Sequence, residues 1–363
     1  MTDNNMQLTL ESRLLPLRLP DSEVALGDVG RIARFEHKGA ELTVFVTLAI
    51  PARGLQEQLA EAIWQALNDL DGIDKVIVDI GWEVAAAKVV DQAMAVPKVR
   101  NIIAVASGKG GVGKSTTAVN LALALAAEGA RVGILDADIY GPSVPTMLGV
   151  AEQRPNIIDN KFMQPVPAHG ICSISMGYMV NEKTPMVWRG PMASGALQQL
   201  LRQTAWPELD YLVIDMPPGT GDIQLTLSQS VPVTGSIVVT TPQDIALLDA
   251  KKGIEMFRKV NVPVLGVVEN MATHICSNCG HEEHIFGSGG GERIARDYDT
   301  RLLGALPLAL TIREQADGGK PSVAADPESD ISLVYRQIAR RLAIALHLAN
   351  QQASVPSIEI SDD

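Results

Sequence analysis

One glycine-rich loop constrains the fold of this chain more than any other stretch. The apolar run IIAVA, residues 102–106, has the β-branched composition of a strand buried on both faces of a parallel sheet. The segment GKGGVGKS, residues 108–115, follows it and fits the pattern G-x-x-x-x-G-K-[ST]. The alanine- and leucine-rich run TTAVNLALALAA then predicts a helix. A strand, such a loop and a helix in this order predict a phosphate-binding loop, or P-loop.

The residue types of this loop explain how it would bind a nucleotide. Glycines carry no Cβ, so the backbone can turn its N–H groups inward, and the helix N-terminus completes an anion site. Lys114 offers a positive charge to the β- and γ-phosphates, and Ser115 offers a hydroxyl to Mg²⁺. A glycine-rich turn without a ligand is the alternative. We predict ATP and Mg²⁺ as cofactors, with binding residues Gly108, Lys109, Gly110, Gly111, Val112, Gly113, Lys114, Ser115 and Thr116.

A second lysine inside the loop, Lys109, makes the chain resemble the deviant-Walker P-loop ATPases. That family includes the MinD and ParA proteins and the nitrogenase iron protein, and its extra lysine reaches the nucleotide of the partner subunit. The resemblance implies a homodimer that sandwiches its nucleotides, with Lys109 acting in trans and Lys114 in cis as catalytic residues. The alternative for Lys109 is a solvated loop lysine.

Carboxylates follow two further predicted strands. Asp136 and Asp138 come after the run RVGIL, and Asp215 comes after YLVI. Because the carboxyl ends of parallel strands border the ligand crevice, these side chains are expected beside the P-loop. Asp215 then has the position of a carboxylate that helps to hold Mg²⁺, and Asp222 lies within reach of the next loop. By resemblance, Asp136 would hold a water on Mg²⁺ and Asp138 would orient the attacking water; a solvated acidic pair is the alternative.

The remaining periodicity predicts an α/β P-loop NTPase fold, a doubly wound and mainly parallel sheet with helices on both faces. Asn270 follows another predicted strand, 264–268, and resembles the adenine-contacting residue of the family; an ordinary turn asparagine is the alternative. Further strands are expected at 236–241 and 302–307, and a helix at 332–349.

The N-terminal part predicts a separate, small α+β domain. Strands are expected at 31–36, 41–50 and 75–80, with an amphipathic helix at 55–70 before the last of them, whereas residues 1–20 are expected to be poorly ordered at their start. The predicted organisation is a small N-terminal domain (1–90), a linker (91–100), a P-loop ATPase domain with the cysteine loop (101–349) and an acidic flexible tail (350–363).

Two cysteines form the candidate metal site. Cys276 and Cys279 have the C-x-x-C spacing that lets two thiolates point at one metal. A symmetric dimer would bring two such pairs together, and four thiolates suit a [4Fe–4S] cluster or zinc. A thioredoxin-like redox pair and a plain surface knuckle are alternatives. Another is a zinc site within one chain, using nearby histidines: His274, His281 and His284.

Six segments together make the resemblance specific to the Mrp/ApbC group of iron–sulfur carrier ATPases. They are SGKGGVGKST, LDADIYGPSVPTMLG, MVWRGPM, DMPPGTGD, TTPQDIAL and VENMATHICSNCG. The resemblance is nearly continuous from Asn101 to about Pro321, and the first hundred residues match only loosely. It implies a homodimer that holds a [4Fe–4S] cluster on paired cysteines, is supplied by an upstream scaffold and hydrolyses ATP to deliver the cluster to apoproteins. The loops after Asp138 and Asp215 would act as nucleotide-sensing switches.

Composition limits the other function classes. The net charge of −12 disfavours nucleic acid as a partner, and no apolar run approaches the ~18 residues of a membrane span. No signal-peptide pattern opens the chain, so a cytoplasmic location without a membrane partner is expected. Three cysteines are too few for a disulfide framework, and Cys172 reads as a buried small hydrophobe. A MinD- or ParA-like positioning ATPase and a zinc-stabilised nucleotide switch are the competing functions.

Overall fold

The computed structural model describes residues 3–87, 95–179, 190–276 and 278–353, without the side chains of residues 190, 191 and 222. Contacts divide the chain into two compact units, one made of Met1–Ala85 with Ala343–Asp363 and the other of Ala86–Leu342. The predicted linker lies partly outside the described residues, as do most of the predicted acidic tail and the segment MVWRGPM. The predicted domain boundaries therefore stay a prediction.

The smaller unit is an α+β sandwich with one three-stranded sheet. Strand β2 is central, antiparallel to β1 and parallel to β3. Alternate residues of β2 are buried, which is the pattern of a sheet with one covered face. Its elements are α1 (Asp3–Leu14), α2 (Leu26–Val29), β1 (Gly30–Lys38), β2 (Glu41–Leu48), the 3₁₀ turn η1 (Arg53–Leu55), α3 (Gln56–Leu67) and β3 (Lys75–Trp82).

From Asp3 onward, the expectation that the chain starts poorly ordered is wrong, because α1 begins at that residue and runs to Leu14. Met6, Leu10 and Leu14 are buried, and their spacing of four places them on one helix face. Arg13 adds a hydrogen bond of 3.0 Å from Nη1 to Ala66 O, next to the end of α3. Three apolar residues among polar neighbours are therefore enough to order this helix against the unit.

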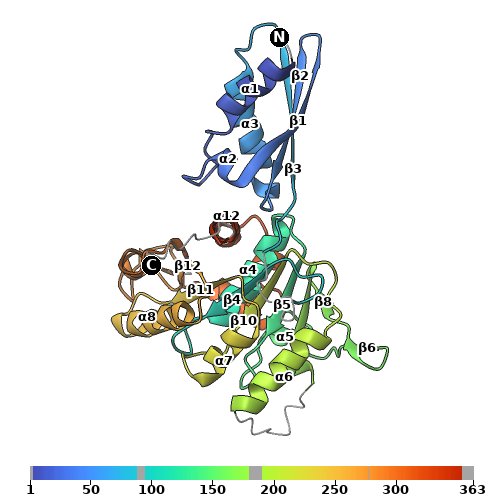
Figure 1. The fold of residues 1–363 in the computed structure, drawn as a ribbon. Helices are drawn as coiled ribbons and strands as arrows, with labels where there is room; N and C mark the ends of the chain where they lie inside the picture. The colour runs from blue at the N-terminus through green and yellow to red at the C-terminus, as the bar shows by residue number, and fades with distance from the viewer. Residues whose placement is uncertain (1–2, 88–94, 180–189, 277, 354–363) are drawn as a thin grey trace, which may run out of the picture. The chain divides into compact units, whose positions relative to one another are not determined.

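The larger unit confirms the predicted α/β class. Its sheet has the strand order β15-β12-β11-β4-β10-β5-β9-β8, and all neighbours are parallel except β8 and β9 (Figure 1). The strands are β4 (Ile102–Ala106), β5 (Val132–Asp136), β8 (Val166–Ala168), β9 (Ile171–Ser175), β10 (Tyr211–Asp215), β11 (Gly235–Thr240), β12 (Val264–Glu269) and β15 (Leu302–Ala305). Every residue of β4, β5 and β10 is buried, as expected for strands covered on both faces.

Helices and two small hairpins complete this unit. The helices are α4 (Lys114–Ala127), α5 (Val144–Met147), η3 (Met176–Tyr178), α6 (Gly190–Gln203), α7 (Asp222–Ser230), α8 (Asp244–Lys259), α9 (Gly290–Asp297), α10 (Leu310–Asp317), α11 (Ser322–Ala325) and α12 (Asp330–Gln352), whose last residues from Ala343 belong to the smaller unit. The hairpins pair β6 (Ile157–Ile158) with β7 (Phe162–Met163), and β13 (His274–Ile275) with β14 (Glu282–Glu283). Among the described helices, none is long and apolar enough to cross a membrane.

The P-loop helix α4 is held at its end by a buried charge. Glu128 follows α4 with its side chain fully buried, and its Oε1 accepts from Arg336 Nε at 2.9 Å and from Arg340 Nη1 at 3.0 Å. Both arginines belong to the part of α12 in the same unit. Buried charges are stable only when paired in this way, so the pairing fixes α4, and with it the P-loop, against the C-terminal helix.

Candidate functional site

The P-loop occupies the turn between β4 and α4, at the carboxyl edge of the sheet. Gly113 takes a left-handed φ of +81° at the N-cap of α4, a conformation that residues with a Cβ rarely adopt. Ser107 O accepts from Gly219 N at 3.0 Å, which attaches the loop after β10 to the P-loop. The glycine-rich residues that the sequence predicted as the phosphate site thus lie in one loop at the end of a helix, where backbone N–H groups are available to an anion.

Lys114 and Asp215 form a buried ion pair below this loop. Lys114 Nζ lies 2.5 Å from Asp215 Oδ1, and the two side chains are 6% and 0% exposed. Burial raises the pKa of Asp215, and the charge of Lys114 opposes that rise. Asp215 Oδ2 is buried and has no hydrogen-bond partner among the described residues, while the Ser115 hydroxyl lies 3.2 Å from Lys114 Nζ. An unpartnered carboxylate oxygen beside a hydroxyl is a donor set that suits Mg²⁺.

Asp136 stands beside Asp215, because β5 and β10 pair with these two residues in register. Its Oδ2 accepts from Ser175 Oγ at 3.0 Å and from Val144 N at 3.2 Å. Burial, and then the charge of Asp215, raises the pKa of Asp136 to about 7. Two adjacent carboxylates therefore share the charge of one lysine, and a divalent cation would neutralise the excess.

Ser175 is a site residue that the sequence analysis missed. It ends β9, which pairs with β5 so that Ser175 lies opposite Asp136. No local motif marks it, because the pairing of β9 with β5 joins segments about forty residues apart, and only register places its hydroxyl at this edge.

Asp138 lies in the loop after β5, at the same end of the sheet. Its Oδ1 accepts from Gly141 N at 3.4 Å, and burial raises its pKa against the charge of Lys114. Lys109 is half-buried, and its carbonyl accepts from Ser107 Oγ at 2.8 Å. The catalytic roles of Asp138, Lys109 and Lys114 stay predictions, and the side chain of Asp222 lies outside the described residues.

Asn270 touches the P-loop itself. Its Nδ2 donates to Val112 O at 2.9 Å, and the side chain is nearly buried, at 8% exposure. A Cβ built on Gly113 would lie 2.2 Å from that nitrogen, so a glycine is required at this close approach. The predicted contact with adenine stays a prediction, and here the amide nitrogen is bonded to the loop backbone.

The two cysteines sit at the turn of the β13–β14 hairpin. Cys276 N donates to His281 O at 2.9 Å, and Gly280 N donates to Cys276 O at 2.8 Å, with Gly280 at a left-handed φ of +71°. Cys276 is partly exposed, Cys279 is exposed, and both thiols are free. Backbone hydrogen bonds from Asn278 and Cys279 lower the pKa of Cys276, which favours the thiolate that a metal requires.

The neighbouring histidines do not join this pair. His274 and His284 turn Nδ1 to backbone carbonyls, those of Leu308 at 3.3 Å and Ala272 at 2.9 Å. His281 Nε2 lies 3.6 Å from Glu283 Oε1. Within the described part of the chain, no three His, Cys, Asp or Glu side chains gather around a possible metal position. The zinc site within one chain therefore finds no support among these residues, and the four-thiolate site shared by two chains stays a prediction.

Cys172 is separate from this pair, and it is only half-buried, not fully buried as predicted. It lies on β9 with Sγ 4.0 Å from Val132 O. Burial raises the pKa of its thiol to about 12, so it stays protonated and unreactive. It therefore serves as a natural control thiol.

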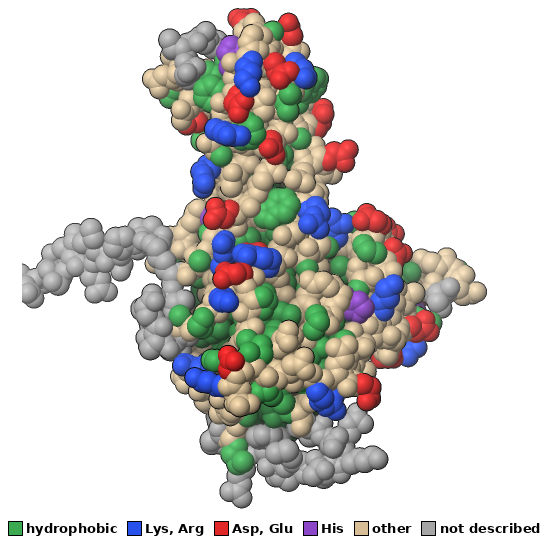
Figure 2. Space-filling model, turned by 90° about the vertical axis from the view of Figure 1, so that its right-hand side faces the viewer, with side chains coloured by type: hydrophobic (Ala, Val, Ile, Leu, Met, Phe, Trp, Pro, Cys, Tyr) green, Lys and Arg blue, Asp and Glu red, His purple; other side chains and the backbone are tan. Residues whose placement is uncertain are grey.

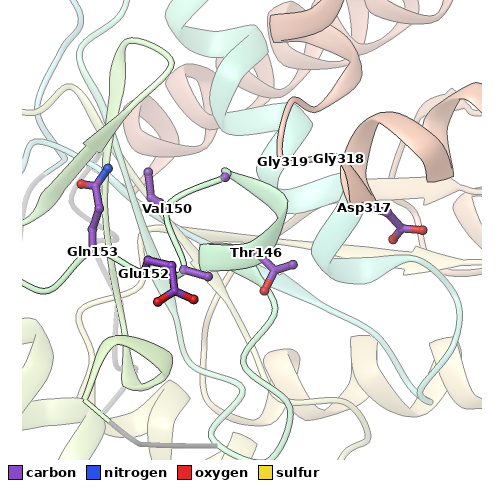
Figure 3. Close-up of a pocket in the computed structure, with 9 residues that line it drawn as sticks. Thr146, Val150, Glu152, Gln153, Asp317, Gly318 and Gly319 are labelled. Carbon is purple, nitrogen blue, oxygen red and sulfur yellow. The ribbon is translucent and has the colours of Figure 1, made fainter.

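A cavity of about 390 Å³ elsewhere in the larger unit shares no residue with these sites (Figure 3). Its lining comes from the end of α5 and the residues after it, and from the end of α10: Thr146, Gly149, Val150, Ala151, Glu152, Gln153, Asp317, Gly318 and Gly319. The carboxylates of Glu152 and Asp317 stand on separate sides of it, from different segments (Figure 3). Thr146 and Gly149 belong to the predicted switch loop after Asp138, and no predicted catalytic or metal-binding residue lines the cavity.

Comparison with known proteins identifies the family of the chain. Residues 98–343 match the ParA family model described as "NUBPL iron-transfer P-loop NTPase". A protein of Pseudomonas fragi named iron-sulfur cluster carrier protein is 65% identical over 275 residues, which are 76% of this chain and 96% of the relative. Its namesake from Escherichia coli strain K12 is 58% identical over 307 residues, 84% of this chain and 83% of the relative.

One of the similar solved structures is a complex with ADP. It is a nucleotide-binding protein from Archaeoglobus fulgidus, with 36% identity, a TM-score of 0.58 and coverage of 67% of this chain and 96% of that one. The P-loop, the strand-end carboxylates and the cysteine pair all fall within residues 98–343. Because the family model and these relatives cover most of the sequence, the chain belongs to the ParA family of P-loop NTPases, whose matching model is described as an iron-transfer P-loop NTPase.

Proposed function

We propose that this chain acts in the cytoplasm as an ATP-dependent iron–sulfur cluster carrier. Two copies would hold one [4Fe–4S] cluster between them, on Cys276 and Cys279 of each, receive it from a scaffold and pass it to apoproteins. The observation that carries the proposal is a pair of free thiols, one exposed and one partly exposed, in the same unit as a P-loop. Among the described residues, no third His, Cys, Asp or Glu ligand joins the pair. The names of the relatives from Pseudomonas fragi and Escherichia coli support it.

The cysteine geometry suits a cargo better than a permanent metal. Four thiolates complete a [4Fe–4S] cluster, and one chain supplies two. A client protein must reach the cluster to take it, and Cys279 lies exposed at the tip of a two-stranded hairpin. A structural zinc site would instead have its four ligands closed around the metal.

The nucleotide half of the mechanism rests on Lys114, Asp215 and their neighbours. Mg²⁺ would be held through Ser115, Asp136 and Asp215, and when bound it neutralises charge on the phosphates. Lys114 Nζ donates to Asp215 Oδ1, and the β- and γ-phosphates would compete for the same cation. Asp138, whose burial raises its pKa, lies at the same edge and would orient the attacking water as a proton acceptor.

A positioning ATPase of the MinD or ParA kind is the second candidate, and the surface offers it little support. On the face shown in Figure 2, lysine and arginine side chains lie among aspartates and glutamates, without a continuous basic area among the described residues. The chain as a whole carries a net charge of −12. That charge repels DNA and anionic lipid, and neither substrate explains the cysteine pair.

The deciding experiment is a metal analysis of anaerobically reconstituted protein. We expect about four irons and four acid-labile sulfides per dimer in the wild type, since a [4Fe–4S] cluster takes four thiolates. Cys276→Ser should lose both while keeping ATP binding, and Lys114→Ala should show the reverse. Cys172→Ser is the matched control, because it removes a cysteine that lies outside the hairpin, and it should load normally.

Zinc analysis of the same samples would contradict the proposal in one clear case. About one zinc per chain without sulfide would indicate a structural knuckle, and the carrier function would then be wrong. Normal iron and sulfide in Cys276→Ser would place the cluster elsewhere.

A further inference from the structure

The segment that carries the cysteines begins and ends beside the same residue of the sheet, Glu269. It departs after Asn270, at the end of β12, and returns at the start of α9. Glu269, which is 4% exposed, closes its base, because its Oε2 accepts from Gly291 N in the first turn of α9. A bulkier residue at Gly291 would meet Glu269, since a Cβ there would lie 3.1 Å from Glu269 Cβ. The cysteine excursion, residues 271–289, therefore starts directly after Glu269 and Asn270 and is tied back to Glu269 at its end.

The second of these residues, Asn270, is bonded to the P-loop. Its side-chain nitrogen donates to Val112 O at 2.9 Å, and its backbone N–H donates to Thr240 O at 2.7 Å. Gly113 leaves no space between that nitrogen and the loop. A phosphate held by the P-loop would contact the same stretch of backbone, so Asn270 is bonded where bound nucleotide would act. It also precedes Cys276 by only six positions.

A strained residue separates this anchor from the hairpin. Met271 has a left-handed φ of +58°, which is unfavourable for a side chain of its kind. Beyond it the chain is firmly bonded: Ala272 N donates to Leu306 O at 2.9 Å, and Leu308 N donates to Thr273 O at 2.6 Å. Strain at a single residue persists only where its surroundings hold it. Met271 is therefore the strained position between the bond of Asn270 to the P-loop and the bonded stretch that starts at Ala272.

We propose that Asn270 is a positioning residue that couples nucleotide at the P-loop to the accessibility of Cys276 and Cys279, with Met271 as the joint. This inference rests on the proposed function, because a cluster carrier gives the reason for coupling nucleotide binding to the cysteines. Asn270 acts here through Val112 and the chain that follows it. A bond released at Val112 frees the Met271 backbone to relax, and the cysteine turn moves with it.

The test is the alkylation rate of the two thiols in the cluster-free full chain. Iodoacetamide labelling of Cys276 and Cys279 is followed by mass spectrometry, without nucleotide and with Mg²⁺ and a non-hydrolysable ATP analogue at a concentration that saturates each variant. The wild type should show a rate ratio of about fivefold or more between the two states, the usual scale of coupling between sites. Asn270→Ala and Met271→Gly should both bring that ratio close to one.

Asn101→Ala provides the matched control. Asn101 is also buried, and its Nδ2 donates to a backbone carbonyl, Asp210 O, at 3.2 Å just before β4, at the opposite end of that strand. Its ratio should equal that of the wild type. Met271→Gly keeps the bond of Asn270 to the P-loop. It therefore tests the coupling even if Asn270→Ala fails to bind nucleotide.

Several outcomes would overturn the inference. The first is a rate ratio near one in the wild type itself. The second is a ratio as large as that of the wild type in Met271→Gly or in nucleotide-bound Asn270→Ala. The third is a loss of the ratio in Asn101→Ala as large as that in Asn270→Ala. Because labelling uses cluster-free protein, its result is independent of the carrier function. A nucleotide-dependent ratio in a wild type that binds no iron or sulfide would refute the carrier function and leave the coupling standing.

Discussion

Two buried carboxylates and one lysine dominate the site at the scale of single residues. Lys114 satisfies one oxygen of Asp215, and Ser175 and backbone N–H groups satisfy Asp136. The charges do not balance, because two acids face one base in a place that water does not reach. Without metal, the edge of the sheet therefore favours protonation of Asp136.

This protonation predicts how stability depends on pH. With a folded-state pKa of about 7, well above its ordinary value, Asp136 binds a proton in the folded chain that the unfolded chain has lost. This contribution to the free energy of unfolding is present at low pH and is lost as pH rises from about 4 to about 7. Urea denaturation of metal-free protein should show the wild type losing about 2 kcal/mol relative to Asp136→Asn between about pH 5 and 7.

The difference between the two proteins is the useful quantity, because acids away from the Asp136 and Asp215 pair titrate alike in both. A difference that stays constant with pH would show that Asp136 is already ionised in the folded, metal-free chain. If the wild type instead gained stability relative to Asp136→Asn as pH rises, the folded-state pKa of Asp136 would be lowered and not raised.

Sequence reasoning reached the carboxylates and missed the hydroxyl. Asp136 and Asp215 end apolar runs of five or so residues, so a parallel sheet places them at one edge wherever the strands lie in order. Ser175 ends the strand ICSIS, which reads as any other strand, and it matters only because β9 lies beside β5. Strand neighbours are a property of the folded chain, which local patterns do not contain.

At the scale of elements, the P-loop is shaped by a helix far away in sequence. A Cβ built on Gly108 would lie 2.1 Å from Asp249 O in α8. On Gly110 the nearest atom would be Pro218 Cβ, 4.0 Å away. The motif requires a glycine at 108 and leaves position 110 open, and the packing agrees, because only Gly108 is confined by a backbone atom that cannot move independently.

We therefore expect two similar substitutions to differ. Gly108→Ala should lower the free energy of unfolding by about 1–3 kcal/mol, the usual cost of overpacking, and should weaken ATP binding by shifting the loop. Gly110→Ala should change stability by less than about 0.5 kcal/mol, as at an open surface position. Chemical denaturation and calorimetric titration with ATP would measure both. Equal destabilisation by the two changes would contradict the packing argument.

The elements themselves show where pattern reading succeeds and fails. The central strands β4, β10 and β12 follow from their apolar runs, and α3 from its periodicity. Helix α1 was missed because its apolar residues stand singly, and their common face is visible only when Met6, Leu10 and Leu14 are counted at a spacing of four. The closure of the cysteine excursion by Glu269 joins residues 22 positions apart, and no composition signal announces it.

At the scale of the whole molecule, the proposed chemistry belongs to two chains. One copy offers two cysteine thiols and one P-loop. The second lysine of that loop, Lys109, is half-buried among the described residues and lies beside exposed glycines. A symmetric partner would supply the other two thiolates. Assembly and cluster binding are therefore expected to depend on one another.

Lys109 gives a direct test of this assembly. In the proposed dimer its charge meets the phosphates of the partner's nucleotide, so Lys109→Ala should raise the dissociation constant of the ATP-bound dimer by about tenfold or more. Sedimentation equilibrium with a non-hydrolysable ATP analogue measures this. Lys161→Ala, at an exposed lysine in the turn between β6 and β7, is the control and should dimerise as the wild type does. Unchanged association of Lys109→Ala would remove the lysine from the interface.

The closure of the cysteine excursion at Glu269 has a consequence for how such proteins diversify. Because both ends meet at the rim of the sheet, the excursion is an insert whose length and content can change while the strands beneath keep their order. Lengthening a closed loop costs little, about 0.6 kcal/mol for each doubling. We therefore expect that replacing residues 271–289 by a short turn would leave nucleotide binding at the P-loop intact while removing both cysteines of the candidate metal site.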